Sequence, residues 1–144
     1  MLQLTHRLSE PVRPTLSLTA PFELRQKSRA RVCLDDGTEA AWLLPRGTVL
    51  RDGDLLQGDD ADDSVVGVIA APEPVSTVLA ADPLLLARAA YHLGNRHVAL
   101  QIGNGWLRYQ RDHVLDAMVR ELGLQVVNEL TPFEPEAGAY HSHG

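Results

Sequence analysis

The sequence is poor in cysteine. Its 144 residues include one, Cys33, so an internal disulfide framework and a zinc site built from Cys-x-x-Cys pairs are both excluded. Cys33 lies in the strand-like run RARVCL, residues 29–34, where a thiol ordinarily behaves as a small buried hydrophobic group. We therefore expect Cys33 to belong to a core.

Basic charge and long hydrophobic runs are also scarce. The chain has 13 Lys and Arg against 19 Asp and Glu, whereas phosphate binding requires concentrated basic side chains, so a general nucleic-acid binder is disfavoured. The longest apolar-rich stretch, residues 84–93, is interrupted by Arg88 and is much shorter than the roughly 18 residues of a membrane span. Because the N-terminus also lacks a secretion-signal pattern, we expect a soluble cytoplasmic protein.

Sequence signatures of catalysis are missing as well. The chain contains no G-x-S-x-G, no phosphate-binding loop and no H-E-x-x-H, the patterns that mark common nucleophilic, nucleotide and zinc enzymes. Its Asp, Glu and Ser residues are scattered, and nothing pairs them as acid and base. The acidic run at 59–63 sits between turn and strand signals and is interpreted as a solvated hairpin tip. We therefore expect that the protein is not an enzyme.

The first half of the chain is typical of short strands separated by turns. Residues 29–34 and 39–44 flank an Asp-Gly turn at 36–37, which is a hairpin signal. A second hairpin is predicted from 48–50 and 55–57 around the turn at 52–53, and a further strand from 64–70. No helical period is found here, so residues 1–72 are predicted to form a small all-β domain.

The pattern changes after APEP, residues 71–74, which holds two prolines in four positions and predicts a domain boundary. The order of elements beyond it is βαββαβ, which is typical of a ferredoxin-like domain over 75–131, with two helices on one face of an antiparallel sheet. The fold class is therefore α+β, and residues 132–144 are predicted to be a flexible tail. The expected elements are a strand at 75–80, a helix from Asp82-Pro83 to Gly94, a hairpin around the turn at 103–105, a helix from Asp112 to Gly123 and a strand at 124–130.

Two histidines in YHLGNRH, residues 91–97, raise the question of a metal site. His92 and His97 are five positions apart, which is about 140° around a helix, whereas a chelating pair at i and i+4 is about 40° apart. They therefore cannot share one ion on one helix. In a strand opened by His97, the apolar Val98, Leu100 and Ile102 share one face, which leaves His97 on the outer face. A lone outward histidine is ordinarily a surface residue without a special role; the alternative is that two copies of His97, brought together by a twofold axis, hold a divalent ion.

The other histidines have different expected roles. His92 lies in the last turn of its helix, where the helix dipole favours a capping or packing role over ligation. His113 opens the second helix, where a neutral imidazole can coordinate a metal, although a surface residue beside its cap is the alternative. His141 and His143 form an H-x-H pattern in the tail, which suits capture of a borderline divalent ion.

Long motifs add a family resemblance. YHLGNRHVALQI (91–102), LRYQRDHVLDAM (107–118) and PFEPEAGAYHSHG (132–144) resemble the urease accessory metallochaperones called UreE, and LLPRG (43–47) is similar to their N-terminal domain. The resemblance implies a β-domain like a chaperone's peptide-binding module, followed by a ferredoxin-like metal-binding domain that dimerises. In that family the histidine of GNRHV binds nickel at the dimer interface, and this position is His97 here.

The same resemblance implies a function and partners. It predicts a homodimer that binds Ni²⁺ and delivers it to apo-urease through the urease accessory GTPase (UreG-type) and its complex, with no nucleic acid or membrane as partner. In members of this family the C-terminal tail supplies further metal ligands, and the resemblance implies this role for His141 and His143. Imidazole also suits Cu²⁺ and Zn²⁺.

The sequence departs from the family pattern at two points. Some members have a peripheral site made from the histidine of DHVL and another two positions earlier; His113 is present here, but position 111 is Arg111. The tail is also shorter than the polyhistidine tails of other members, so a large nickel store is not expected. The alternative function is a scaffold that docks the GTPase with incidental metal binding, and a metal-responsive regulator is the weakest hypothesis.

Overall fold

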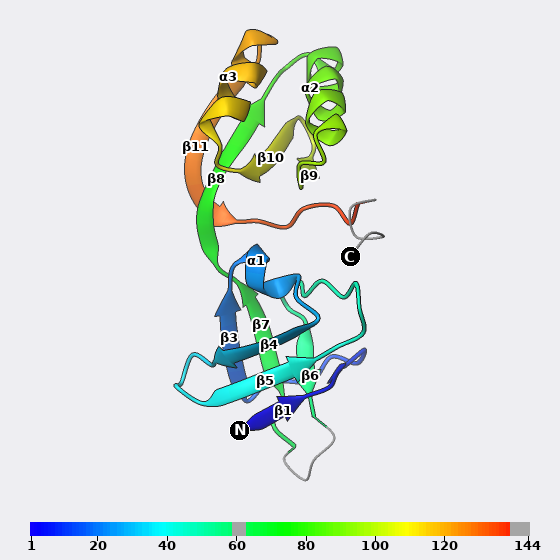
Figure 1. The fold of residues 1–144 in the computed structure, drawn as a ribbon, viewed down its shortest axis with the longest axis vertical. Coiled ribbons are helices and arrows are strands. Elements are labelled where there is room, and N and C mark those ends of the chain that lie inside the picture. The colour runs from blue at the N-terminus through cyan, green and yellow to red at the C-terminus, as the bar shows by residue number, and fades with distance from the viewer. Residues whose placement is uncertain (59–62, 139–144) are drawn as a thin grey trace. The chain divides into compact units, whose positions relative to one another are not determined.

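The computed structural model describes residues 1–58 and 63–138, and its chain divides after Ala71 into two compact units (Figure 1). The predicted α+β class is confirmed, because the first unit is β-rich and the second combines a sheet with two helices. His141 and His143 lie outside the described residues, as does most of the acidic run at 59–63. None of the described helices has the length and apolar character needed to cross a membrane.

The first unit packs two sheets around one apolar core, in which Leu4, Trp42 and Leu56 are almost completely buried. Its three-stranded sheet has the order β1-β5-β4 and its four-stranded sheet the order β2-β6-β7-β3, with β1 parallel to β5 and β3 parallel to β7. The elements are β1 (Leu2–Leu4), β2 (His6–Arg7), β3 (Leu16–Ala20), α1 (Phe22–Arg25), β4 (Arg29–Cys33), β5 (Glu39–Leu43), β6 (Leu55–Gln57) and β7 (Val66–Ala70).

One of the two predicted hairpins in this unit is confirmed. β4 and β5 are antiparallel around Gly37, whose φ of 93° is the left-handed value that the turn requires. The second hairpin is wrong, because residues 48–50 form no strand. The backbone N–H of Leu50 donates to the carbonyl of Arg25, and the Leu50 carbonyl accepts from the buried Arg25 guanidinium. The helix α1 was not predicted, since four residues are too few to display a helical period.

The expected burial of Cys33 is also wrong. Cys33 is exposed, as are Arg29 and Arg31 on the same strand. Side chains alternate along a strand, so these three residues share the outer face of β4. Ala30 and Val32 face the other way and pack against the core.

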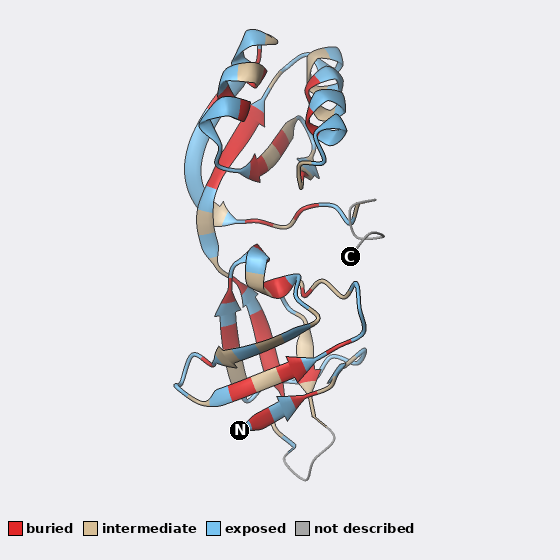
Figure 2. Cartoon of the chain, viewed as in Figure 1, coloured by how far each residue is buried: buried red, intermediate tan, exposed pale blue. Residues whose placement is uncertain are grey.

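The second unit is a four-stranded antiparallel sheet of order β11-β8-β10-β9, which is the ferredoxin-like order. Val78, Leu107 and Val126 lie side by side on one face of this sheet and are buried with residues from both helices (Figure 2). Both helices therefore cover that face. The elements are β8 (Pro72–Leu79), α2 (Pro83–Asn95), β9 (Gln101–Gly103), β10 (Trp106–Gln110), α3 (His113–Glu121) and β11 (Gln125–Pro132).

The ends of this unit differ from the expectation. β8 starts at Pro72 rather than residue 75, and its first residue is paired with Pro132 of β11. Both prolines are at the end of the ladder, where a missing N–H leaves no central hydrogen bond unmade. Phe133, expected in the flexible tail, is fully buried. The N–H groups of Glu134 and Glu136 donate to the Gln101 side chain and the Leu100 carbonyl, so this stretch is fixed against the start of β9.

A buried polar network joins α3 to the sheet. The Tyr109 hydroxyl donates to Asp116 Oδ1 over 2.6 Å, and Asn128 Nδ2 donates to Asp116 Oδ2 and to Ser76 Oγ, each over 3.0 Å. Burial alone would raise the pKa of Asp116, but hydrogen bonds from Tyr109, Ser76 and Asn128 outweigh it and lower that pKa. Burial and the adjacent carboxylate raise the pKa of Tyr109. The network thus stabilises an ionised carboxylate inside the unit.

Replacing this carboxylate should destabilise the protein. We expect Asp116→Asn to lower the free energy of unfolding by about 2 to 3 kcal/mol, since an amide cannot accept from all the donors that surround this position. Because the folded state lowers the pKa of Asp116, its stabilising contribution is present above the ordinary carboxyl pKa and is lost as the pH falls through the lower folded value. Urea unfolding at pH 7 and at pH 3 measures both effects. The exposed Glu121→Gln is the control, and equal stability of Asp116→Asn and this control would contradict the prediction.

Candidate metal-binding site

The helix that precedes His97 is fixed at its N-terminus by the predicted cap. The side chain of Asp82 accepts from the backbone N–H of Leu84 over 2.9 Å, and Pro83 occupies the first helical position. Proline is suited to this place because its φ is already helical and its missing N–H would have no partner. The helix then buries Ala89 and Leu93 against the sheet, which places its C-terminus at the start of the β9 segment.

The end of α2 differs from the prediction. Gly94 does not terminate the helix; α2 continues to Asn95, and the residue with left-handed backbone is His97, at φ 59°. The N–H of His97 donates to the carbonyl of Gly94, and the N–H of Val98 donates to the carbonyl of Leu93. These two bonds form a Schellman motif, in which the left-handed position is usually glycine. The sequence has histidine rather than glycine at position 97, so it carried no signal that predicts this motif.

His97 is therefore in a turn and does not open a strand. β9 starts at Gln101, and Ile102, predicted to face the core, is 53% exposed. The prediction that residues 98, 100 and 102 share one buried face is wrong for Ile102. The regular alternation of a strand does not extend back to the turn. Leu100 is buried, and its carbonyl accepts from Glu136 rather than from β10.

The His97 side chain is exposed, as the sequence predicted. Among the described residues, no hydrogen bond or ion pair involves its imidazole. A left-handed backbone costs an L-residue about 1 to 2 kcal/mol, although histidine is among the side chains enriched there. The chain thus places a solvent-accessible imidazole on a strained turn, and no described contact of that imidazole offsets the strain.

The other two histidines predicted from this unit, His92 and His113, are also exposed. His92 is exposed on the last turn of α2, with its ring edge-on to Tyr91 at 5.2 Å between centroids. His113 is exposed at the first position of α3, directly after Asp112, whose side chain accepts from two backbone N–H groups of that helix. Neither residue joins a larger ligand set: within residues 1–58 and 63–138, no three His, Cys, Asp or Glu side chains gather to hold a metal ion.

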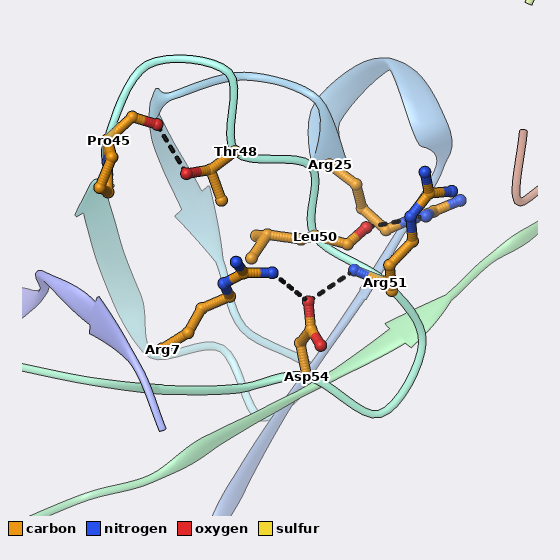
Figure 3. Close-up of polar contacts among 7 residues, drawn as sticks. All are labelled: Arg7, Arg25, Pro45, Thr48, Leu50, Arg51 and Asp54. Atoms are coloured by element: carbon orange, nitrogen blue, oxygen red, sulfur yellow. Dashed lines mark hydrogen bonds and ion pairs between the residues drawn. The ribbon is translucent and has the colours of Figure 1, made fainter. Parts of the chain in front are cut away.

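The first unit contains a polar cleft of about 420 Å³. It is lined by residues 5–9, by Asp54 and by residues from the LLPRG segment and its neighbour Thr48. Arg7 Nη1 lies 3.4 Å from Asp54 Oδ2, which also accepts from the backbone N–H of Arg51 (Figure 3). The Thr48 hydroxyl donates to the Pro45 carbonyl, which holds the loop at the other side of the cleft.

The fold and these features define a two-domain protein, in which a small β-unit is followed by a ferredoxin-like unit with a surface histidine at the end of its first helix. Family models match both units: the N-terminal domain of the UreE urease accessory protein over residues 3–71 and its C-terminal domain over residues 73–144. The chain therefore belongs to the UreE family of urease accessory proteins.

Individual relatives agree with this assignment. A urease accessory protein UreE from Pseudomonas putida is 61% identical over 99% of this chain and 88% of its own length. Those from Alkalilimnicola ehrlichii and an Enterobacter species are 60% and 58% identical, over 97% and 99% of this chain and 85% and 93% of their own lengths. All three carry the name urease accessory protein UreE, in agreement with the two family models.

The cap of α2 offers a test of how this helix is held. We expect Asp82→Ala to lower the free energy of unfolding by about 1 kcal/mol, because the N–H of Leu84 loses its acceptor. Chemical denaturation followed by circular dichroism measures the change. Asp82→Asn keeps a capping oxygen and should remain close to the wild type, so a loss as large as that of Asp82→Ala would show that the cap is not the cause.

Proposed function

We propose that this protein binds Ni²⁺ through His97 and delivers it to apo-urease while the urease active site is assembled. The observation that carries the proposal is the exposed imidazole of His97, which lies on a strained turn without a described hydrogen-bond partner. Imidazole nitrogen is a suitable ligand for nickel, as it is for copper and zinc. Among these ions we propose nickel, because the resemblance to the urease accessory family implies a nickel ligand at this position.

The proposed site requires a second copy of the chain. One imidazole cannot hold a transition metal tightly, and within the described part of its own chain His97 belongs to no group of three or more His, Cys, Asp or Glu side chains that could hold an ion. A twofold axis beside His97 would supply the partner subunit's His97. His141 and His143, which lie outside the described residues, are proposed as further ligands, and His113 as a weaker, peripheral one.

Exposed apolar side chains on α2 and an apolar cleft beside this helix support self-association. Leu84 and Tyr91 are 56% and 68% exposed and are seven residues apart, so they lie on one side of α2. A cleft of about 280 Å³ between α2 and the β9–β10 hairpin is lined mainly by apolar residues, including Ala90 and Ile102. Apolar surface of this kind marks interaction sites in soluble proteins. We propose that it forms part of a homodimer interface beside His97.

Delivery sets a limit on affinity. Micromolar binding corresponds to about 8 kcal/mol, and each tenfold tightening adds about 1.4 kcal/mol that the acceptor must overcome. Two imidazoles at an interface, supplemented by tail histidines that dissociate one at a time, fit a carrier that gives up its ion to the urease accessory GTPase (UreG-type) and apo-urease. Metal binding needs neutral imidazole, so nickel uptake competes with protons. The carrier is proposed to act in the cytoplasm.

The two units are proposed to divide this work. Residues 75–131 would bind metal and dimerise, residues 132–144 would supply tail ligands, and residues 1–72 would contact a partner. The polar cleft beside Arg7 and the LLPRG segment suits the last role, because it combines backbone at the short edge strand β2 with a charged side chain. This is where a peptide segment of the urease machinery would dock.

The ligand role of His97 can be measured directly. We expect His97→Ala to abolish the tightest nickel binding in titration calorimetry while the circular dichroism spectrum stays unchanged, since the side chain is exposed. His92→Ala is the matched control, because it removes an exposed histidine from the same helix end. Unchanged stoichiometry and affinity in His97→Ala would refute the assignment.

The same variant separates nickel delivery from the alternative, a scaffold that docks the GTPase with incidental metal. If the protein is a carrier, His97→Ala loses urease activation in low nickel although it still binds the GTPase. Full activation by His97→Ala under these conditions would favour the scaffold.

The interface can be tested apart from the metal. We expect Tyr91→Asp to weaken self-association at least tenfold, because a charge would be placed in an apolar contact. Sedimentation equilibrium without metal measures this. Glu121→Asp, an exposed change on α3, should leave the dimer unchanged, and a Tyr91→Asp protein that associates like the wild type would place the interface elsewhere.

A further inference from the structure

The two helices of the ferredoxin-like unit end in the same way. At the end of α2 the N–H of His97 donates to Gly94 and that of Val98 to Leu93, over 3.0 and 3.2 Å. At the end of α3 the corresponding bonds run from Gly123 to Arg120 and from Leu124 to Val119, over 3.0 and 3.4 Å. Each pair closes a Schellman turn around one left-handed residue. The chain therefore contains an internal comparison of one turn built on histidine and one built on glycine.

The two left-handed residues carry different costs. Gly123, at φ 98°, adopts this conformation without a steric penalty. His97, at φ 59°, has a Cβ that crowds its own backbone, and its imidazole is exposed. Residues held in a strained backbone conformation are typical of functional sites. Position 97 fits this description, because glycine would adopt the same conformation without strain.

The turn also determines where the imidazole can lie. Leu93 is fully buried and Val98 is packed against the same core cluster, so apolar contacts hold both ends of the turn. The turn at α3 is held similarly by the buried Val119 and Leu124. Metal-binding histidines are usually oriented by a hydrogen bond to their second ring nitrogen; His97 has no such bond among the described residues. Its backbone is thus the part of the site that is fixed.

We propose that the left-handed turn closed by Val98 is a positioning device that presents the His97 imidazole for metal binding at the expense of stability. This inference rests on the proposed function of His97. Val98 is then a positioning residue that contacts no metal but keeps the direction of the His97 Cα–Cβ bond constant. A second copy of the chain would meet an imidazole attached to a fixed backbone rather than one on a mobile loop.

The cost in stability is tested by substituting the left-handed residue of each turn. We expect His97→Gly to raise the midpoint of thermal unfolding by about 3 °C or more, measured without metal and at one protein concentration. Gly123→Ala should lower the midpoint by a similar amount, for its Cβ would meet only an ordinary contact with Leu85 and the penalty would be that of the backbone. A His97→Gly protein no more stable than the wild type would overturn the idea that His97 strains the turn.

The positioning role is tested by nickel titration of variants that keep His97. We expect Val98→Ala to weaken the tightest nickel binding about tenfold. The conservative variant Val98→Ile should bind nickel as tightly as the wild type. Leu124→Ala, a truncation to alanine at the corresponding position of the other turn, should cost stability but leave nickel affinity unchanged. The variants are compared at a concentration where light scattering gives them the same mass as the wild type.

These outcomes separate the two proposals. Wild-type nickel affinity in Val98→Ala, together with loss in His97→Ala, would overturn the positioning role while the ligand role stands. Equal weakening by Val98→Ala and Leu124→Ala would also overturn it, because general destabilisation would then explain both. Unchanged affinity in His97→Ala would overturn the proposed function itself, which no result with Val98→Ala alone can do.

Discussion

The carbonyl groups at the end of α2 need hydrogen-bond donors, and the turn that supplies these donors decides where His97 lies. The N–H groups of His97 and Val98 reach back to Gly94 and Leu93, which forces one residue into the left-handed region. That residue is His97. Helix packing holds the start of the turn, and the buried Leu100 holds the chain that follows. The exposure of the imidazole is thus a consequence of how the helix ends.

The ferredoxin-like unit is held together by buried polar groups as well as by its apolar core. Asp116 is 3% exposed, yet its two carboxylate oxygens accept from Tyr109 and Asn128. The first unit uses a comparable device, because the buried Arg25 donates to the carbonyls of Ala20 and Leu50. A buried charge is tolerated only where its hydrogen bonds are made, so both groups specify one arrangement of the segments they join.

Much of the second unit could be predicted because its signals are local. Asp82 and Asp112 cap their helices, Gly123 ends the second one and the βαββαβ order follows from periodicity. The first unit was less predictable: residues 48–50 resemble a strand, but the buried guanidinium of Arg25 engages their backbone instead. Cys33 was misassigned for a related reason, since alternation shows that a strand has two faces without showing which face meets a core.

The sequence by itself determined the element order of the ferredoxin-like unit, the family and the choice of His97 as the residue to examine, because helix caps, turns and long motifs are encoded in neighbouring residues. Only the tertiary structure decided that Gly94 lies within the helix, that His97 takes the left-handed turn and that Phe133 is buried beside residues that the sequence assigned to a tail. These features depend on which backbone groups find partners far along the chain, as Glu136 does with Leu100. Such partners are chosen by packing, which no local pattern specifies.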